Sequence, residues 1–197
     1  MDTPEIIDAL PAHEAPIRAH SDATFQSHAA RLPHAFGDEN AFQHTLLDAV
    51  FHAPPNLTSD FRCKLLVALG DEKLMGYILI IWHAAKNGAV TPAVIADIGV
   101  FPEYEGRGVG RLLLAHAKSL MPQLGWQSLT ADVWRDNAAS HKIFSTMGFE
   151  AERTEYRFGP APAPQKDNPP SKTPALSREH LLILLALAAG LLIYLTS

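Results

Sequence analysis

Residues 100–111 read VFPEYEGRGVGR and separate two stretches of different periodicity. Before them, residues 93–100 form an apolar run that predicts a strand, which ends at Phe101. After them, apolar residues recur at helical spacing between 112 and 121, which predicts a helix ending near Pro122. The order is therefore strand, glycine-rich turn, helix.

The glycine-rich turn suits a pyrophosphate. Gly106, Gly108 and Gly110 allow successive N–H groups to point into one concavity, and the helix that follows adds the positive end of its dipole. Arg107 and Arg111 add positive charge. A simple tight turn is the alternative interpretation. The stretch differs from a dinucleotide fingerprint and lacks the Gly-Lys-Ser/Thr of a nucleoside triphosphate site.

The rest of the first 158 residues alternates between helical and β-rich segments. Two helices are predicted between 21 and 50, and the runs 63–69 and 74–82 surround Gly70-Asp71-Glu72-Lys73 as a hairpin would. Downstream, the predictions are a strand over 128–134, a helix over 137–147 and a last β segment ending near Phe158. This order predicts an α/β or α+β fold, a sheet covered by helices.

Together, the glycine-rich stretch and a second block resemble the GCN5-related N-acetyltransferase (GNAT) family. The second block runs from Val133-Trp134-Arg135-Asp136-Asn137 to Gly148-Phe149. The resemblance covers roughly residues 65–158. It implies a twisted, mostly antiparallel mixed sheet flanked by helices and splayed between its fourth and fifth strands. It also implies that acetyl-CoA binds in that cleft and that an amine attacks its thioester directly.

The resemblance also assigns residues to acetyl-CoA. The backbone of Ile98, Gly99 and Val100 is expected to pair with the pantetheine arm, and Asn137 to lie near the cofactor. Asn137 has a second interpretation, as an ordinary helix N-cap, and both can hold together. The residues expected to hold the pyrophosphate are Glu105, Gly106, Arg107, Gly108, Val109, Gly110 and Arg111.

Asp97 is the candidate general base. It interrupts the apolar run 94–98 where the cleft should open, and an aspartate in such a strand is costly to bury without a role. The alternatives are an exposed strand face or a local structural hydrogen bond. Two positions depart from the family pattern. Glu105 stands where the signature has Gln or Arg, and Phe144, where many members have a tyrosine acid, has no proton to donate.

Composition limits the classes of function. With 197 residues and 21.5 kDa the chain has room for about one domain. Its net charge of −5 and the lack of a long basic run argue against nucleic acid as a partner. A single cysteine, Cys63, excludes an intrachain disulfide and favours a reducing compartment. The 10 histidines are scattered without ligand spacing, so no metal site is predicted.

The C-terminal part has a different composition. Residues 160–177 are predicted to be a proline-rich linker after a domain over 1–159, and residues 178–197 a transmembrane helix. The uncharged run 181–197 would span about 25 Å as a helix, at the short end for a bilayer. Its basic N-terminal flank places the domain on the cytoplasmic side of a single-pass anchor. A buried core helix and a helix docked in a partner's groove are the alternatives.

Two functions follow from the sequence. The first is a membrane-tethered N-acetyltransferase that uses acetyl-CoA to acetylate a primary amine. The second is a catalytically inactive subunit or adaptor of a membrane protein complex, favoured by Glu105, Phe144 and the anchor. Binding of acetyl-CoA discriminates between the two.

Overall fold

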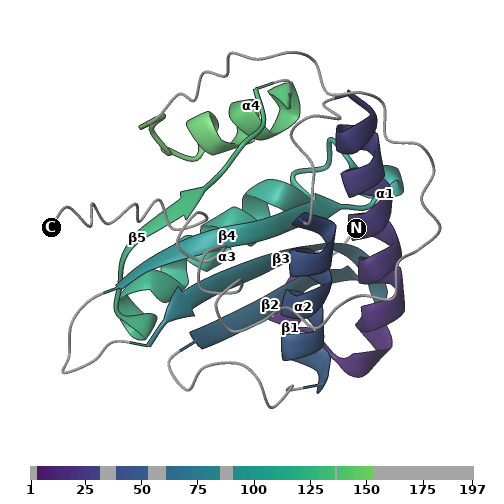
Figure 1. The fold of residues 1–197 in the computed structure, drawn as a ribbon, viewed down its shortest axis with the longest axis horizontal. Helices are drawn as coiled ribbons and strands as arrows, with labels where there is room; N and C mark the ends of the chain where they lie inside the picture. Colours follow the sequence, from purple (N-terminus) through teal and green to yellow (C-terminus); the bar gives the residue numbers. More distant parts are fainter. Residues whose placement is uncertain (1–3, 32–38, 53–60, 85–90, 136, 153–197) are drawn as a thin grey trace, which may run out of the picture.

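The computed structural model describes residues 4–31, 39–52, 61–84, 91–135 and 137–152. Within these ranges the chain forms five strands, four α-helices and two short 3-10 helices (Figure 1). In chain order they are β1 Glu5–Asp8, η1 Pro11–His13, α1 Glu14–Arg31, α2 Glu39–His52, β2 Phe61–Gly70, β3 Lys73–His83, β4 Thr91–Val100, η2 Pro102–Tyr104, α3 Val109–Leu124, β5 Trp126–Ala131 and α4 Ala138–Thr146.

The strands form one sheet in the order β1-β2-β3-β4-β5. Neighbours pair antiparallel from β1 to β4, whereas β5 is parallel to β4 because α3 crosses over between them. The predicted mixed, mostly antiparallel sheet flanked by helices is therefore confirmed.

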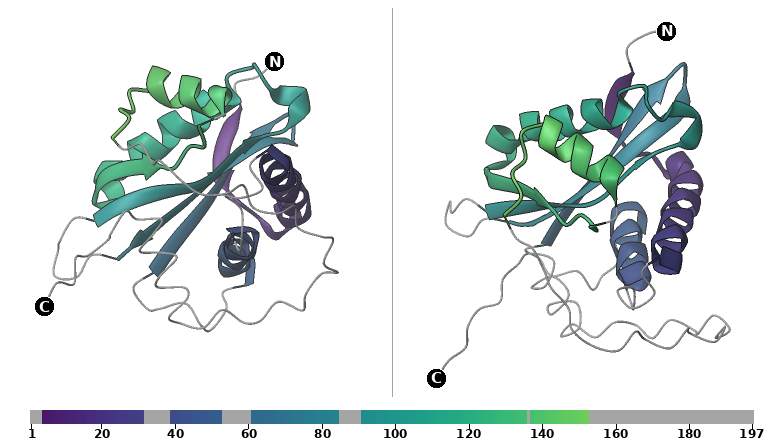
Figure 2. Two further views of the ribbon diagram at one scale, coloured as in Figure 1. Left: turned by 45° about the horizontal axis from the view of Figure 1, so that its top comes forward. Right: turned by 90° about the horizontal axis from the view of Figure 1, so that it is seen from above.

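Helices cover both faces of the sheet (Figure 2). α3 and α4 lie on one face, and α1 and α2 lie on the other. The strands accordingly alternate between two cores. On β3, Ile78 and Ile80 belong to the core on the α3 face, and Tyr77 and Leu79 to the core on the α1/α2 face.

The predicted hairpin is present, with a tight turn. Gly70 pairs with Lys73, so only Asp71 and Glu72 connect β2 to β3. Both have positive φ angles, 50° and 60°. Two consecutive residues in this region form the type I′ turn that matches the twist of a hairpin.

Two details at the N-terminal end differ from the sequence prediction. β1 was not predicted, since it has only four residues, and its pairing with β2 depends on residues about 60 positions away. α1 begins at Glu14 rather than near Ser21. Pro16 is compatible with this start because the first N–H groups of a helix have no partner within it.

The C-terminal predictions lie outside the described residues. These are the end of the last β segment near Phe158, the domain boundary at 159 and 160, the linker and the membrane helix over 178–197. They stay predictions.

Candidate active site

The sheet opens between β4 and β5. Their pairing runs from Thr91 with Trp126 to Ile95 with Ala131 and ends there. The second half of β4 continues to pair with β3 as far as Val100. From Ala96 onward, the β5-facing edge of β4 therefore makes no strand pairs within the described ranges. Figure 1 shows β5 diverging from β4 toward α4.

A β-bulge determines which way Asp97 faces. Leu79 pairs with Asp97 but Ile80 pairs with Ile95, so Ala96 is one extra residue in β4. Paired residues share a face of the sheet, and Leu79 belongs to the α1/α2 core. Asp97 therefore faces α1 and α2. Without the extra residue, the alternation of the strand would place Asp97 on the α3 face with Ile95.

A cleft of about 190 Å³ lies where the strands separate. Asp97 and Ile98 of β4 line it, and the segment after β5 contributes Asp132 and Trp134. The other lining residues come from α1, α2, both strands and α4: Ser21, Thr24, Phe25, His28, Gln43, Ile95, Ala96, Ala131, Val133, Asn137, Ser140 and Phe144. Among these described residues the ionisable ones are two aspartates and one histidine, so carboxylates determine the charge of the cleft.

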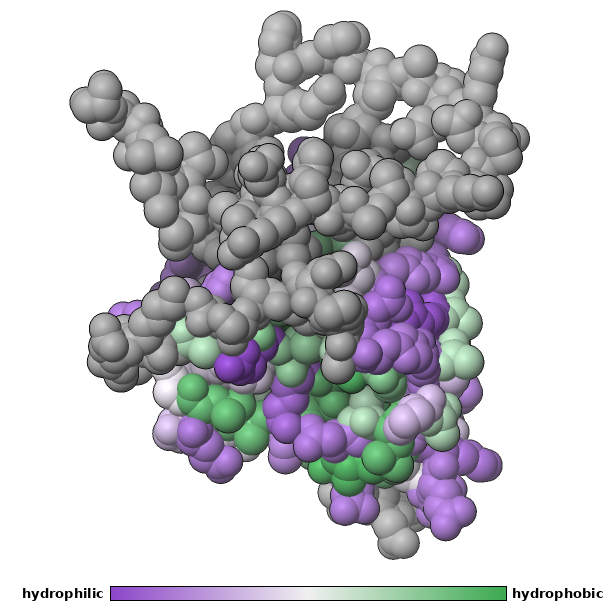
Figure 3. Space-filling view, turned by 60° about the horizontal axis from the view of Figure 1, so that its bottom comes forward, coloured by the Kyte–Doolittle hydropathy of each residue, from purple (hydrophilic) through white to green (hydrophobic). Residues whose placement is uncertain are grey.

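Trp134 is one of the large apolar residues that the described surface exposes. The exposed fraction of Trp134 is 39%. The other two large apolar residues exposed on the described surface are Leu10 and Leu124. The described part of the face in Figure 3 mixes hydrophobic and hydrophilic residues. Trp134 differs from the other two because it lines the cleft.

The glycine-rich turn has the geometry of an anion cradle. Gly106 and Gly108 adopt φ angles of +71° and +83°, and a Cβ built on either would meet no atom within 4 Å. The first bond of α3 runs from Leu112 N–H to Gly108 O. The N–H groups of residues 109–111 therefore have no acceptor within the helix. Open space, free backbone donors and a helix N-terminus occur at one place, as a pyrophosphate requires.

Glu105 comes directly before the first glycine of this cradle. Its side chain is exposed, and its backbone is the C-cap of η2. The guanidinium of Arg107 lies over the Tyr104 ring, 5.6 Å from its centroid. The negative charge that departs from the family signature thus lies on an exposed side chain, and the Arg107 guanidinium contacts the Tyr104 ring.

Three hydrogen bonds converge on one oxygen of Asp97. Oδ2 accepts from Ser21 Oγ at 3.1 Å, Gln43 Nε2 at 2.8 Å and the Tyr77 hydroxyl at 2.9 Å. The donors come from α1, α2 and β3. The interpretation of Asp97 as an exposed strand residue is therefore wrong, and structural hydrogen bonds are present in a residue that also lines the cleft.

Burial raises the pKa of Asp97, although hydrogen bonds from Tyr77, Ser21 and Gln43 act in the opposite direction. Burial also raises the pKa of Tyr77 well above its usual value, and the negative charge of Asp97 adds to that rise. Tyr77 thus remains a hydroxyl donor throughout the pH range in which Asp97 titrates.

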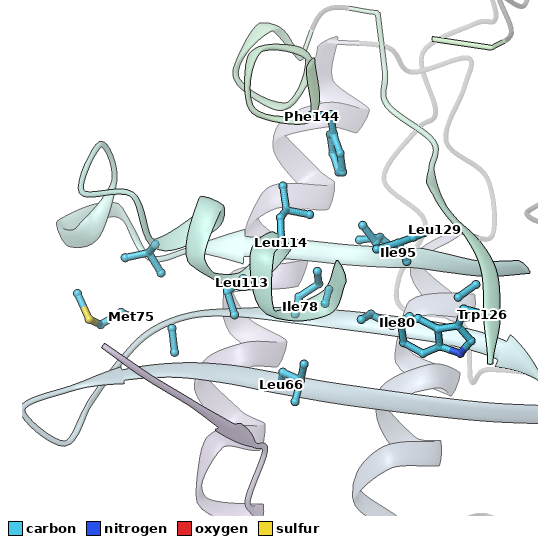
Figure 4. Close-up of a cluster of buried hydrophobic side chains, with 14 residues drawn as sticks. Leu66, Met75, Ile78, Ile80, Ile95, Leu113, Leu114, Trp126, Leu129 and Phe144 are labelled. Carbon is cyan, nitrogen blue, oxygen red and sulfur yellow. The ribbon is translucent and has the colours of Figure 1, made fainter. Parts of the chain in front are cut away.

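Asn137 and Phe144 connect α4 to the cleft. Asn137 caps α4, with its Oδ1 accepting from Ser140 N at 3.1 Å, so the N-cap interpretation holds while the residue also lines the cleft. Phe144 points from α4 toward the sheet in Figure 4. It is 7% exposed and packs edge-on against Phe149, with ring centroids 5.0 Å apart.

No sequence pattern singles out Tyr77, Ser21 or Gln43. Tyr77 lies within an apolar strand, and the other two are ordinary polar residues of helices 54 to 76 positions from Asp97. The one available signal was Asp97 itself, since a buried carboxylate needs donors from somewhere.

A family model described as "Acetyltransferase (GNAT) family" matches residues 22–149. The chain belongs to the GNAT family. The match includes the second half of α1 and all of α2, which lie before the region where the sequence resemblance begins. This membership agrees with the opened sheet and the cradle before α3.

This chain spans about half the length of two curated relatives that it matches. Streptothricin acetyltransferase from Streptomyces lavendulae is 30% identical over 90 residues, which are 46% of each chain. The uncharacterized N-acetyltransferase YycN from Bacillus subtilis is 26% identical over 82 residues, 42% of this chain and 51% of that relative.

Solved structures share the GNAT fold at low identity. The tetramutant of the BH1408 protein from Bacillus halodurans has a TM-score of 0.62 at 16% identity and covers 79% of this chain and 99% of its own. AAC(6')-Iy in complex with the bisubstrate analogue CoA-S-monomethyl-acetylneamine has a TM-score of 0.53 at 19% identity, covering 81% and 99%.

The described residues contain neither a metal-ligand cluster nor a membrane-spanning helix. No group of three His, Cys, Asp or Glu side chains within them could hold a metal ion. None of the helices described is both long and apolar enough to cross a bilayer. Residues 181–197 lie outside this part of the chain.

Proposed function

We propose that this GNAT protein transfers the acetyl group of acetyl-CoA to a primary amine. The observation that carries the proposal is the opening of the sheet beside the cradle at the start of α3. Residues 96–100 offer a strand edge that no described residue pairs with, and Gly106 and Gly108 offer open space next to the first N–H groups of α3. The family of the chain supports this use.

On the cofactor side, β4 and the glycine-rich turn each bind a different part of acetyl-CoA. The backbone of Ile98, Gly99 and Val100 pairs with the pantetheine arm as an added strand would. The turn from Gly106 to Arg111 holds the pyrophosphate through the N–H groups of residues 109–111, since the N–H of Arg107 donates to Tyr104 O at 3.4 Å, and the side chains of Arg107 and Arg111 add charge. When bound, acetyl-CoA supplies an activated acyl carbon. Asn137, the N-cap of α4, lines the cleft and contacts the cofactor in this scheme.

On the acceptor side, Asp97 takes the proton that the ammonium must lose before its nitrogen can attack. The reaction forms a C–N bond and breaks the thioester C–S bond, so the attacking nitrogen must lose a second proton and the departing thiolate must gain one. Phe144 cannot carry this proton, and in this scheme water takes it from the nitrogen and gives one to the thiolate. Asp97 and Asp132 make the cleft suited to a positively charged amine.

The test of this function is release of the CoA thiol from acetyl-CoA in the presence of a panel of primary amines, followed with a thiol reagent. We expect at least one amine to accelerate release in proportion to enzyme concentration. No acceleration by any amine, together with normal acetyl-CoA binding, would favour the second function, the inactive subunit or adaptor.

Glu105→Arg is expected to lower the Kd for acetyl-CoA by about tenfold, because it reverses a charge beside the pyrophosphate cradle. The measurement is calorimetric titration at physiological salt. Glu103→Arg is the matched control, since it makes the same charge change at an exposed residue of η2 outside the signature. Equal effects of the two variants would show only a response to net charge.

Membrane tethering belongs to the same proposal. It is supported by the uncharged run over 181–197 after a proline-rich segment and a basic flank. We expect the full chain to float with phospholipid vesicles in a density gradient, and the chain lacking residues 176–197 to stay in solution as a folded protein. A full chain that remains soluble without vesicles or detergent would contradict the anchor.

A further inference from the structure

We propose that Tyr77, Ser21 and Gln43 are positioning residues that hold Asp97 by Oδ2 and leave Oδ1 as the oxygen that takes the proton of the amine. This inference rests on the proposed function, in which Asp97 is the base. It adds three residues outside the glycine-rich stretch and a choice between the two carboxylate oxygens.

The first argument is the number of donors on one atom. A carboxylate oxygen has about two lone pairs, and Oδ2 already accepts three hydrogen bonds of 2.8 to 3.1 Å. No hydrogen bond reaches Oδ1 from the residues that the structure describes. The acceptor capacity of the carboxylate is thus concentrated on Oδ1.

The second argument is that the donors fix the orientation of the carboxylate. They come from two helices and from the neighbouring strand, so rotation of the Asp97 side chain would break bonds to three separate elements. Ser21 and Gln43 also line the cleft, whereas Tyr77 is buried in the α1/α2 core. The bulge at Ala96 turns Asp97 toward all three.

The third argument concerns the room that Tyr77 needs. Tyr77 lies opposite Gly99 in the sheet, and a Cβ on Gly99 would come within 2.6 Å of its ring. His20 also lies close to Gly99 and contacts Tyr77: its Nδ1 is 3.5 Å from the hydroxyl and its Nε2 is 3.1 Å from Val100 O. Through His20, the end of β4 at Val100 is therefore connected to Tyr77 and so to Asp97.

The pKa of Asp97 reports whether the three donors act on its carboxylate. Burial opposes its ionised form, and each donor on Oδ2 favours it. Removing the hydroxyl of Tyr77 should therefore raise the pKa of Asp97. The titratable groups around this carboxyl are His20, Asp22 and His28 of α1, His44 of α2, which binds Asp22, Tyr77 of β3, and Asp132 after β5. Tyr77→Phe keeps the other groups and removes the hydroxyl, which also lies 3.5 Å from His20 Nδ1.

The experiment follows the 13C resonance of the Asp97 carboxyl against pH in the full chain, assigned by its loss in Asp97→Asn. We expect the midpoint to move to higher pH in Tyr77→Phe, and also in Ser21→Ala, which guards against one variant failing to fold. Tyr104→Phe, which removes a hydroxyl near the cradle, and Thr24→Val, which changes a cleft residue of α1, should leave it unmoved.

An unchanged midpoint in folded Tyr77→Phe and Ser21→Ala would overturn the proposal, because the donors would then not act on the charge of Asp97. Failure of the proposed function looks different. In that case the midpoint moves as expected, but no amine accelerates release of the CoA thiol by the wild type. Where transfer is measurable, the acidic limb of the kcat/KM profile should move in the same direction as the carbon resonance.

Discussion

Asp97→Asn is expected to lower kcat for acetyl transfer by about 10²–10⁴-fold, the usual contribution of a general base. The amide oxygen can take the place of Oδ2 and accept from Ser21, Gln43 and Tyr77 as before. The amide nitrogen then replaces Oδ1, the oxygen assigned to take the proton. The measurement is thiol release with the most active amine of the panel, at saturating acetyl-CoA.

Stability separates this loss from misfolding. Because the three hydrogen bonds are kept, the free energy of unfolding of Asp97→Asn should stay within about 1 kcal/mol of the wild type. Burial raises the pKa of Asp97 in the folded state above its pKa in the unfolded chain. The protonated carboxyl therefore contributes to stability below the unfolded-state pKa, and this contribution is lost as pH rises through the folded-state pKa. The variant should therefore lack that pH dependence. Full activity of a folded Asp97→Asn would show that Asp97 has only a structural role.

Gly108→Glu is expected to weaken acetyl-CoA binding by more than about 100-fold. Gly108 is the N-cap of α3 at a φ of +83°, beside the free N–H groups of the helix start. A side chain there occupies the open space of the cradle and brings a negative charge to the pyrophosphate. The measurement is the Kd for acetyl-CoA by calorimetry.

The far end of the same helix provides a matched control. Gly125 is the C-cap of α3, also has a positive φ, +66°, and also has no atom within 4 Å of a built Cβ. Gly125→Glu imposes a comparable backbone strain, of about 1–2 kcal/mol, away from the cradle. It should bind acetyl-CoA as the wild type does. Unchanged affinity in a folded Gly108→Glu would remove the phosphate cradle from the account.

The sequence predicted the parts of the fold that depend on local patterns. The apolar run before Phe101, the glycines and the helical spacing after residue 112 identify the β4–α3 unit, because each depends on neighbouring residues. Asn137 likewise indicated the start of α4 through its capping chemistry. The hairpin between β2 and β3 followed from two β-rich runs around a short polar turn.

What the sequence could not predict depends on contacts between distant segments. The bulge at Ala96 is visible only in the register between β3 and β4. The hydrogen bonds of Asp97 join residues 20, 54 and 76 positions apart. Tyr77 gave no signal, because a tyrosine in an apolar strand fits a core as well as a site. β1 was missed because four residues are too few for a periodicity.

Calorimetric titration of acetyl-CoA into the full chain, with dephospho-CoA as a comparison, tests the central claim most directly. The account predicts saturable binding with one site per chain, weakened by Gly108→Glu and not by Gly125→Glu. No binding by a chain that circular dichroism shows to be folded would contradict the account. It would make Glu105 a disabling change and leave the inactive subunit or adaptor as the function to pursue.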